Sequence, residues 1–395
     1  MLTAGSAADR TGARKVFLIG LAAFGIGSAA CAAAPGLGAL IAARAVQGLG
    51  ASALLPCSLS LIVHQYPGTR ARARALGVWG GMGSLGVALG PVLGGGLIAT
   101  VGWRAIFLVN VPVCALTAWL LIRYVAESEP DTTRRTDLPG LLLGIGALAG
   151  ITAAFIEAGR EGWLSPLPDA LGAAGIVTAA AFTVTEAKFS GRSGRDPMLP
   201  MHLFRSRPFS TATSVGFLFN GCLYGALLCI SLYLQQARHE SAAMTGLLIL
   251  PMSVAVGAGS TASGWVTARF GPRLPMVTGL ALSAAGAALL SLVGPTSSLA
   301  LLVGGTVILG MCSLAMPAMT AVVVGSAGRE HAGVASGVLN TARQAGGALG
   351  VALLGSLLVS GGRGAQALTL HTPLIVSAAG LLIAVCLAWV ATHRS

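Results

Sequence analysis

The chain has 395 residues, of which 55% are apolar, 9% are charged and 56 are glycine. Soluble domains typically contain about 25% charged residues, and disordered chains combine low hydrophobicity with high charge. The composition therefore excludes both classes, and it predicts an all-α polytopic membrane protein.

The formal net charge of +12 raises the question of a polyanionic partner. Nearly all charges lie in short breaks between long apolar blocks, without a basic stripe or interleaved aromatic residues, so we expect no nucleic-acid partner. The seven cysteines lie inside the blocks and the six histidines lie in loops or at block ends, without the spacing of a metal site. We therefore expect neither a metal nor a cofactor.

Twelve apolar blocks follow one another along the chain. Most approach or exceed the ~20 residues that a helix needs to cross ~30 Å of hydrocarbon. Peptide groups in lipid must bond to one another, so each block is predicted to be a transmembrane helix. The blocks are 16–34, 39–63, 75–101, 105–122, 138–156, 170–185, 209–234, 243–268, 274–294, 298–325, 332–360 and 373–392.

The loop charges predict how these helices are oriented. Alternate loops lie on opposite sides, and one side holds 18 Lys and Arg residues whereas the other holds 4. Cytoplasmic loops retain positive charge, so we expect both termini in the cytoplasm and the protein in the inner (plasma) membrane, surrounded by lipids. Two long polar loops divide the chain into a bundle at 1–125, an insert and linker at 126–208, and a six-helix bundle at 209–395.

The block 75–101 contains the string G-x-x-x-G-P-x-x-G-G, formed by Gly86, Gly90, Pro91, Gly94 and Gly95. Glycines at i, i+4 and i+8 share one helix face, where another helix can approach closely, and the proline removes a backbone donor. Tight helix packing alone would explain this pattern. The complete string, however, resembles the antiporter signature of the major facilitator superfamily, which implies a helical-bundle transporter.

The segment 5–15 resembles the cytoplasmic loop between the second and third helices of that superfamily. It places Asp9 beside Arg10 and Arg14 at a helix end. An acid among cations can form a charge-assisted latch that breaks and re-forms as bundles rock. The alternative is a simple positively charged anchor on the cytoplasmic side.

Arg44 lies within the second block, and Gln47 follows it at i+3 on the same face. The surrounding segment 40–50 resembles the family's intramembrane arginine motif. An arginine inside a span costs at least ~2.5 kcal/mol, so it should face the bundle interior and have a partner. The alternative is that Arg44, near the outer end of its block, extends its side chain to the membrane surface.

Two further segments, 102–112 and 331–347, resemble signatures of the fourteen-span drug/proton antiporters of EmrB/QacA type. Members of that branch carry two extra helices between two six-helix halves, and the blocks 138–156 and 170–185 would be this pair. A member also begins with two helices ahead of the segment 5–15. We therefore expect that this chain lacks the first two helices, through truncation or a late start codon.

No acidic residue lies inside any predicted block. Proton coupling commonly uses a buried carboxylate with a raised pKa, and the resemblance implies that this acid sits on the absent first helix and faces Arg44. On this hypothesis Arg44 and Gln47 couple protons, and Asp9, Arg10 and Arg14 gate the transporter. The chain as written could then be inactive.

Polar residues in two late blocks are candidates for a substrate cavity. Asn220 and Tyr224 share a face at i, i+4, as do Asn340 and Gln344, and Arg343 lies beside the second pair. Each could instead form an interhelical hydrogen bond. A P-loop is absent from the sequence, so transport would not use ATP.

Together these features predict a secondary transporter, not an enzyme, that exports small amphipathic drugs or antibiotics against inward proton flow by alternating access. Two alternatives remain open. The chain could be a facilitator for an endogenous metabolite, or a truncated membrane fragment that does not transport.

Overall fold

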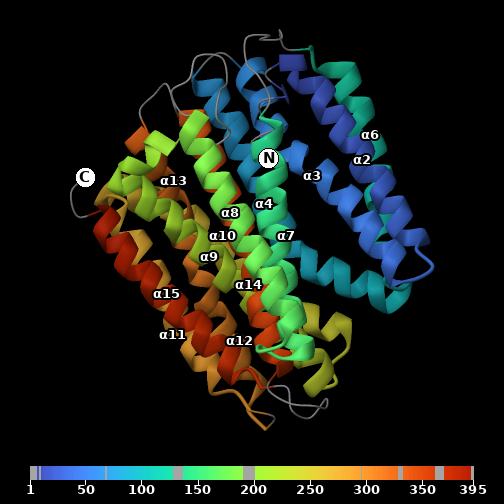
Figure 1. Cartoon of the computed structure of the whole chain (residues 1–395), viewed down its shortest axis with the longest axis vertical. Helices are drawn as coiled ribbons and strands as arrows, with labels where there is room; N and C mark the ends of the chain where they lie inside the picture. The colour runs from blue at the N-terminus through green and yellow to red at the C-terminus, as the bar shows by residue number, and fades with distance from the viewer. Residues whose placement is uncertain are drawn as a thin grey trace. The chain divides into compact units, whose positions relative to one another are not determined.

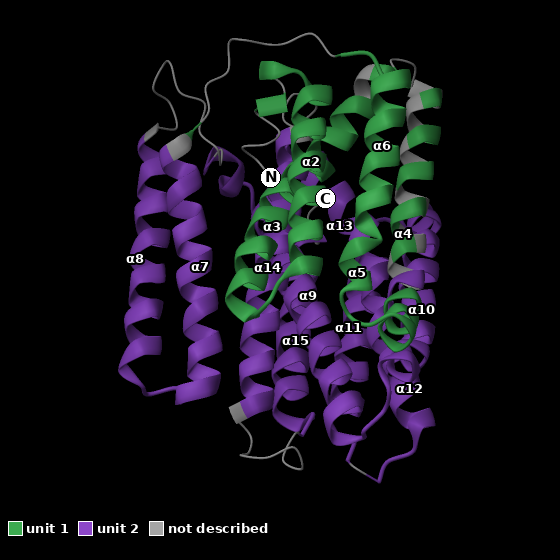
Figure 2. Cartoon of the chain, turned by 90° about the vertical axis from the view of Figure 1, so that its right-hand side faces the viewer, with its two compact units in different colours: residues 1–86, 92–137, 192–198 green, residues 87–91, 138–191, 199–395 purple. Residues whose placement is uncertain are grey.

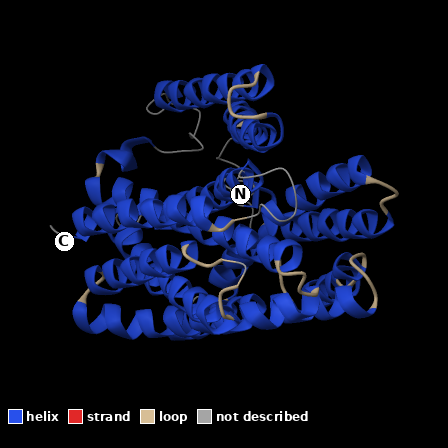
Figure 3. Ribbon diagram, turned by 90° about the horizontal axis from the view of Figure 1, so that it is seen from below, coloured by secondary structure: helices blue, strands red, loops and turns tan. Residues whose placement is uncertain are grey.

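The computed structural model describes residues 7–8, 10–66, 69–127, 137–189, 201–294, 296–327, 332–360 and 369–392. All regular secondary structure in these ranges is helical (Figures 1 and 3). The all-α prediction is confirmed. Helices are the expected result for segments whose peptide groups find no water to bond with.

The first part of the chain forms a series of helices separated by short turns. Three of them are long, and the fourth crossing is made of a single turn followed directly by a longer helix. These helices are α2 (Ala13–Ala33), α3 (Leu37–Gln65), α4 (Thr69–Thr100), α5 (Ala105–Leu108) and α6 (Asn110–Tyr124).

The remainder of the chain adds eight spans. They are α7 (Leu138–Glu161), α8 (Pro166–Phe189), α9 (Arg207–Leu232), α10 (Ala242–Phe270), α11 (Arg273–Ser291), α12 (Leu299–Gly310) continued by α13 (Ala315–Ala327), α14 (Ala332–Ser360) and α15 (His371–Thr392). Three short turns complete the set: η1 (Met201–Arg205), the π-turn η2 (Tyr233–Ala237) and η3 (Met311–Leu314). Ser241 and Ser298 start two of the helices, because each hydroxyl accepts a hydrogen bond from the first turn.

The helices match the membrane spans expected from the sequence. Eleven helical segments in the described ranges are long and apolar enough to cross a membrane, and the apolar part of α4, Leu89–Thr100, adds a shorter one. Each of the twelve predicted blocks falls on one of these helices. The chain is a polytopic integral membrane protein.

The chain divides into two compact units (Figure 2). Unit 1 comprises residues 1–86, 92–137 and 192–198, and unit 2 comprises residues 87–91, 138–191 and 199–395. The pair α7 and α8, which the sequence assigned to an insert, therefore belongs to the same unit as α9 to α15. A side chain at Gly159 of α7 would meet the backbone of Ser356, which shows how closely α7 packs on α14.

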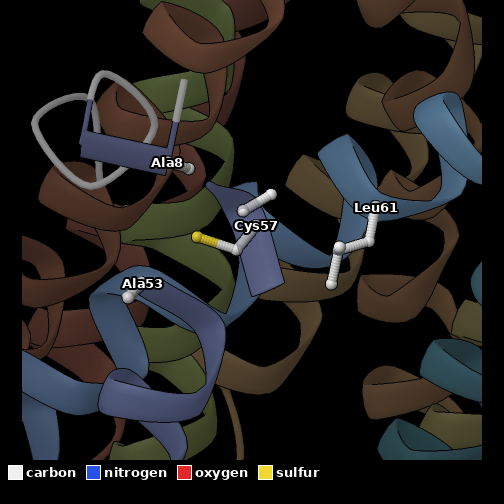
Figure 4. Close-up of a cluster of buried hydrophobic side chains, with 5 residues drawn as sticks. Ala8, Ala53, Cys57 and Leu61 are labelled. Carbon is white, nitrogen blue, oxygen red and sulfur yellow. The ribbon is translucent and has the colours of Figure 1, made fainter. Parts of the chain in front are cut away.

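A buried cluster of mostly small side chains lies in unit 1 where α2 and the residues just before it meet α3 (Figure 4). Ala8, Ala13, Ala53, Cys57 and Leu61 are its buried members. Small residues let two helices approach until their backbones touch, which supplies the packing contacts that hold helices together in lipid. This close crossing brings the inner faces of α2 and α3 into hydrogen-bonding range.

In unit 2, four glycines form an equally close crossing between α9 and α14. A side chain on Gly221 would meet the backbone of Gly346, and one on Gly225 would meet that of Gly350. Each helix thus carries a G-x-x-x-G pair at the crossing. The crossing fixes α14 against α9 along the faces that carry Arg343 and Asn220.

Candidate functional site

In unit 1, four polar side chains form a hydrogen-bonded network across three helices. Arg44 Nη1 donates to Gln47 Oε1 at 2.6 Å, and Gln47 Nε2 donates to Ser28 Oγ of α2 at 2.6 Å. Asn110 Nδ2 of α6 reaches the same Ser28 hydroxyl at 3.4 Å. The network therefore connects α2, α3 and α6.

Gln47 is the centre of this network. Only 3% of its surface is exposed, and both ends of its amide are bonded, as a buried amide requires. Glycine at position 27 makes room for it, because a side chain there would meet the Gln47 backbone at 2.7 Å. The sequence predicted Arg44 and Gln47 as site residues but not Ser28. The signal that could have indicated Ser28 is its hydroxyl, the single serine side chain in the apolar block 16–34.

Arg44 is exposed at the edge of this network. Its guanidinium carbon lies 5.8 Å from the centroid of the Phe107 ring, within the range of a cation–π contact. No carboxylate forms an ion pair with Arg44 among the described residues. The Gln47 amide oxygen thus accepts one hydrogen bond from Arg44, and the other N–H groups of the guanidinium can bind a further partner.

The first turn of α2 is tied to the last turn of α6 and to Glu127, which follows it. The Arg14 backbone N–H donates to Glu127 Oε1 at 3.1 Å, and Arg14 Nη2 donates to the Ile122 carbonyl at 3.1 Å. Gly12 has a φ of 98°, and a side chain there would collide with Glu127, so the turn requires glycine. Arg10 is half-buried beside it, and Asp9 lies outside the described residues. Arg14 thus bonds within unit 1.

The glycine string of α4 has an open face. Gly86 and Gly90 are exposed, Pro91 and Gly94 are half-buried, and Gly95 is buried. A side chain at Gly86, Gly90 or Gly94 would meet no described atom within 4 Å. The described residues place no helix against this face, which therefore stays available for the close approach that the spacing allows.

In unit 2, Arg343 and Asn220 bond across the α9–α14 crossing. Arg343 Nε donates to Asn220 Oδ1 at 3.3 Å, although the two residues are 123 positions apart in the sequence. Arg343 Nη2 lies 3.4 Å from Met316 Sδ, and its guanidinium carbon lies 5.8 Å from the centroid of the Phe219 ring. Asn220 is 2% exposed, so this contact is buried on the α9 side.

The other predicted cavity residues lie around this pair. Tyr224, one turn beyond Asn220, is 43% exposed, and its ring lies 3.4 Å from the position that a side chain on Gly347 would take. Asn340 is half-buried and Gln344 is exposed. Within the described ranges, no hydrogen bond joins either of these two residues to Arg343.

A break in one span lies next to Arg343. The helix α12 ends in the 3-10 turn η3 before α13 begins. Serine hydroxyls from neighbouring helices bond two carbonyls at the break: Ser283 donates to Leu309 O of α12 at 2.7 Å, and Ser263 donates to Leu314 O of η3 at 2.5 Å. The contact residue Met316 lies in the first turn of α13. The sequence treated this span as one uninterrupted block.

The chain matches the Major Facilitator Superfamily over residues 1–351 and 213–395. It is 40% identical to the methylenomycin A resistance protein of Streptomyces coelicolor, covering 91% of this chain and 75% of the relative. It is 36% identical to the multidrug resistance protein Stp of Mycobacterium tuberculosis, covering 91% of this chain and 66% of that protein.

Solved structures share the fold at low sequence identity. The human organic anion transporter MFSD10 aligns with a TM-score of 0.62 and 19% identity, over 98% of this chain and 79% of that chain. A POT family transporter in complex with 5-aminolevulinic acid aligns with a TM-score of 0.68 and 17% identity, over 98% of this chain and 84% of that chain. At these identities the likeness establishes the architecture alone.

Proposed function

Because this chain belongs to the major facilitator superfamily, we propose that it exports small amphipathic compounds, antibiotics among them, in exchange for inward-moving protons. Export proceeds by alternating access, in which helical bundles rock around a central site. The observation that carries the proposal is the similarity to resistance proteins over 91% of the chain. The polar groups around Arg44 and Arg343, set among apolar helices, are the candidate machinery.

The family and the names of the relatives place the chain among membrane transporters and not among enzymes, as the sequence predicted. The relatives are named for resistance to methylenomycin A and to multiple drugs. Drug export is therefore the transport activity that fits this chain best.

The orientation in the membrane is part of the proposal. Both termini lie in the cytoplasm and the protein resides in the inner (plasma) membrane, in contact with lipids. The 18 to 4 distribution of Lys and Arg between alternate loops supports this orientation. The sequence contains no P-loop, so the proton gradient rather than ATP supplies the energy, and a nucleic-acid partner is not part of the proposal.

The proposal also assigns the chain to the fourteen-span drug/proton antiporters. Two observations support it: along the chain, the helix pair α7 and α8 comes between the two sets of spans, and the chain spans 66% to 75% of the length of the two relatives described. On this assignment two further helices precede residue 1 in the complete protein, and residues 1–125, 126–208 and 209–395 are the remaining bundle, the insert and the second bundle. Sequencing of the DNA upstream of Met1 tests the assignment.

We assign Arg44 to proton coupling. Its bond to Gln47, itself held by Ser28, fixes the guanidinium at one place in unit 1. A carboxylate that faces Arg44 would change its proton affinity as the pair forms and breaks. Asp9, Arg10 and Arg14 would gate this change. In the glycine string that also holds Pro91 and Gly95, the open face of Gly86, Gly90 and Gly94 would let a helix approach during the cycle.

The test is drug-driven proton movement in vesicles from a pump-deficient host that expresses the complete gene. The Arg44→Ala variant should lose proton movement at least tenfold while its amount in the membrane stays the same. Arg160→Ala is the matched control, because that side chain is 71% exposed and, among the described residues, its ion pair is with Glu157. Unchanged proton movement in Arg44→Ala would refute the role of Arg44, and no drug export by the wild type would refute the function.

A further inference from the structure

We propose that Arg343, together with Asn220, binds the carboxylate of an anionic amphipathic substrate in unit 2. This inference rests on the proposed function, because it names the substrate class that the exporter carries. It concerns one helix crossing, and every residue involved belongs to the same compact unit.

The first observation is that Arg343 has unused donors. An arginine carries five N–H donors in a planar fork. Within the described ranges, Nε bonds to Asn220 Oδ1 and one Nη2 hydrogen points to Met316 Sδ, a weak acceptor. Three N–H groups are left for a ligand, and a fork of this kind matches the two oxygens of a carboxylate.

The second observation is that Arg343 forms no ion pair with any described acid of unit 2. Among these acids, Glu157, Glu161, Asp169 and Glu186 lie in the first or last turns of their helices, and Glu240 lies in the turn before α10. A cation that has left water needs a partner, or the desolvation cost of several kcal/mol is not offset. A ligand carboxylate would supply the missing charge.

The third observation is the apolar wall beside the guanidinium. The Phe219 ring lies 5.8 Å from the guanidinium carbon, and Met316 lies on the Nη2 side. Tyr224 presents its half-exposed ring one turn beyond Asn220. Phe219 is itself buried and stacks against the guanidinium from within the protein. A ligand with a carboxylate at one end and an aromatic or aliphatic body would contact the fork together with Met316 and Tyr224.

The close helix crossing holds the fork in place. A side chain on Gly216 would meet Arg343 Cγ at 3.1 Å, so glycine there leaves the stem of the arginine its path. Asn220 accepts from Nε and thereby fixes the plane of the guanidinium. Such a preorganised fork loses little side-chain entropy when an anion binds.

The test measures binding of two probes to the purified full chain in lipid nanodiscs by equilibrium dialysis at pH 7. The probes are 1-naphthaleneacetate and 1-naphthaleneacetamide, which share one apolar body and differ in charge. The wild type should bind the anion at least tenfold more tightly than the amide, in keeping with a charge-assisted contact. Arg343→Gln should remove this preference and leave the affinity for the amide within twofold.

Asn220→Asp is the sharper variant, because it changes one atom and places a carboxylate next to Nε. It should also abolish the preference for the anion, although it adds an ion pair to the crossing and should not weaken the fold. Arg269→Gln, an exposed arginine at the end of α10, is the matched control and should keep the preference. A thermal melt of each variant establishes that the protein is folded.

The inference is overturned if the wild type shows no preference for the anion, or if the folded Arg343→Gln or Asn220→Asp protein keeps it. Drug-susceptibility assays on the same variants separate this result from the proposed function. If the protein exports drugs but shows no preference for the anion, the carboxylate subsite is refuted and the proposed export function stands. If it binds the anion through Arg343 but exports no drug, the subsite stands and the proposed export function is refuted.

Discussion

Each unit of the molecule contains one arginine within a span, and the two share a pattern of contacts. Arg44 in unit 1 donates to the amide oxygen of Gln47, and Arg343 in unit 2 donates to that of Asn220. Each guanidinium carbon lies 5.8 Å from a phenylalanine centroid. In both units, an amide oxygen and an aromatic ring contact the cation, and neither arginine forms an ion pair with a described residue.

The difference lies in where the amide comes from. Gln47 lies one turn beyond Arg44 on the same helix, at 2.6 Å, so this bond survives any movement of α3 as a rigid body. Asn220 lies on a different helix from Arg343, at 3.3 Å, so this bond depends on the α9–α14 crossing. The comparison shows that a local partner keeps an arginine available during motion, whereas a distant partner ties it to one helix packing.

The largest expected effect comes from disturbing that crossing. Gly350→Ala should destabilise the protein by about 3 kcal/mol, because the added carbon would overlap the Gly221 backbone. Gly257→Ala in α10 is the control, since its added carbon would meet nothing within 4 Å. There alanine should be neutral or stabilising by up to ~1 kcal/mol, because it favours helix. Thermal melts in detergent measure both, and equal shifts would contradict the assigned crossing.

An intermediate effect is expected at the centre of the unit 1 network. Gln47→Leu should cost about 1 to 2 kcal/mol, because it removes the bonds to Arg44 and to Ser28 at a buried position. Gln344→Leu, on an exposed side chain of α14, should change stability by less than ~0.5 kcal/mol. The measurement is the unfolding midpoint of each variant in the same detergent. A Gln47 variant as stable as the Gln344 variant would remove the basis for a structural network.

The smallest expected effect is the difference in coupling energy between the two arginine–amide pairs. Double-mutant cycles should give a coupling of about 0.6 kcal/mol, and at most ~1.7, for the interhelical pair Arg343 and Asn220. The same-helix pair Arg44 and Gln47 should couple by only ~0.2 to 0.5 kcal/mol. Unfolding of single and double alanine variants in mixed micelles provides the four free energies for each cycle. A larger coupling for Arg44 and Gln47 would reverse the distinction between local and distant partners.

Much of the fold could be predicted from the order of residues because membrane spans are a local property. Each predicted block coincides with a helix, since about 20 consecutive apolar residues must satisfy their own backbone in lipid. The contact between Arg44 and Gln47 could also be predicted from the sequence, because residues three positions apart on a helix have their side chains on the same face.

The glycines show where prediction from a pattern stopped. The string at Gly86, Gly90 and Gly94 predicts close packing, yet its face meets no described atom within 4 Å. Gly221 and Gly350 lie outside that string, and their backbones pack directly on each other. A G-x-x-x-G spacing indicates that another helix can approach closely, but it does not indicate which helix will do so.

The sequence by itself determined that lipid surrounds this protein, how many spans it has and where they lie, and that Arg44 and Arg343 fall inside apolar blocks, because these properties follow from neighbouring residues. Only the tertiary structure decided that Arg343 meets Asn220 across 123 residues and that Ser28 completes the Gln47 network. Helix pairing depends on which faces meet and at what rotation. Because all apolar helix faces are nearly equivalent in lipid, the complementarity of their shapes and a few polar contacts determine which helices pack together.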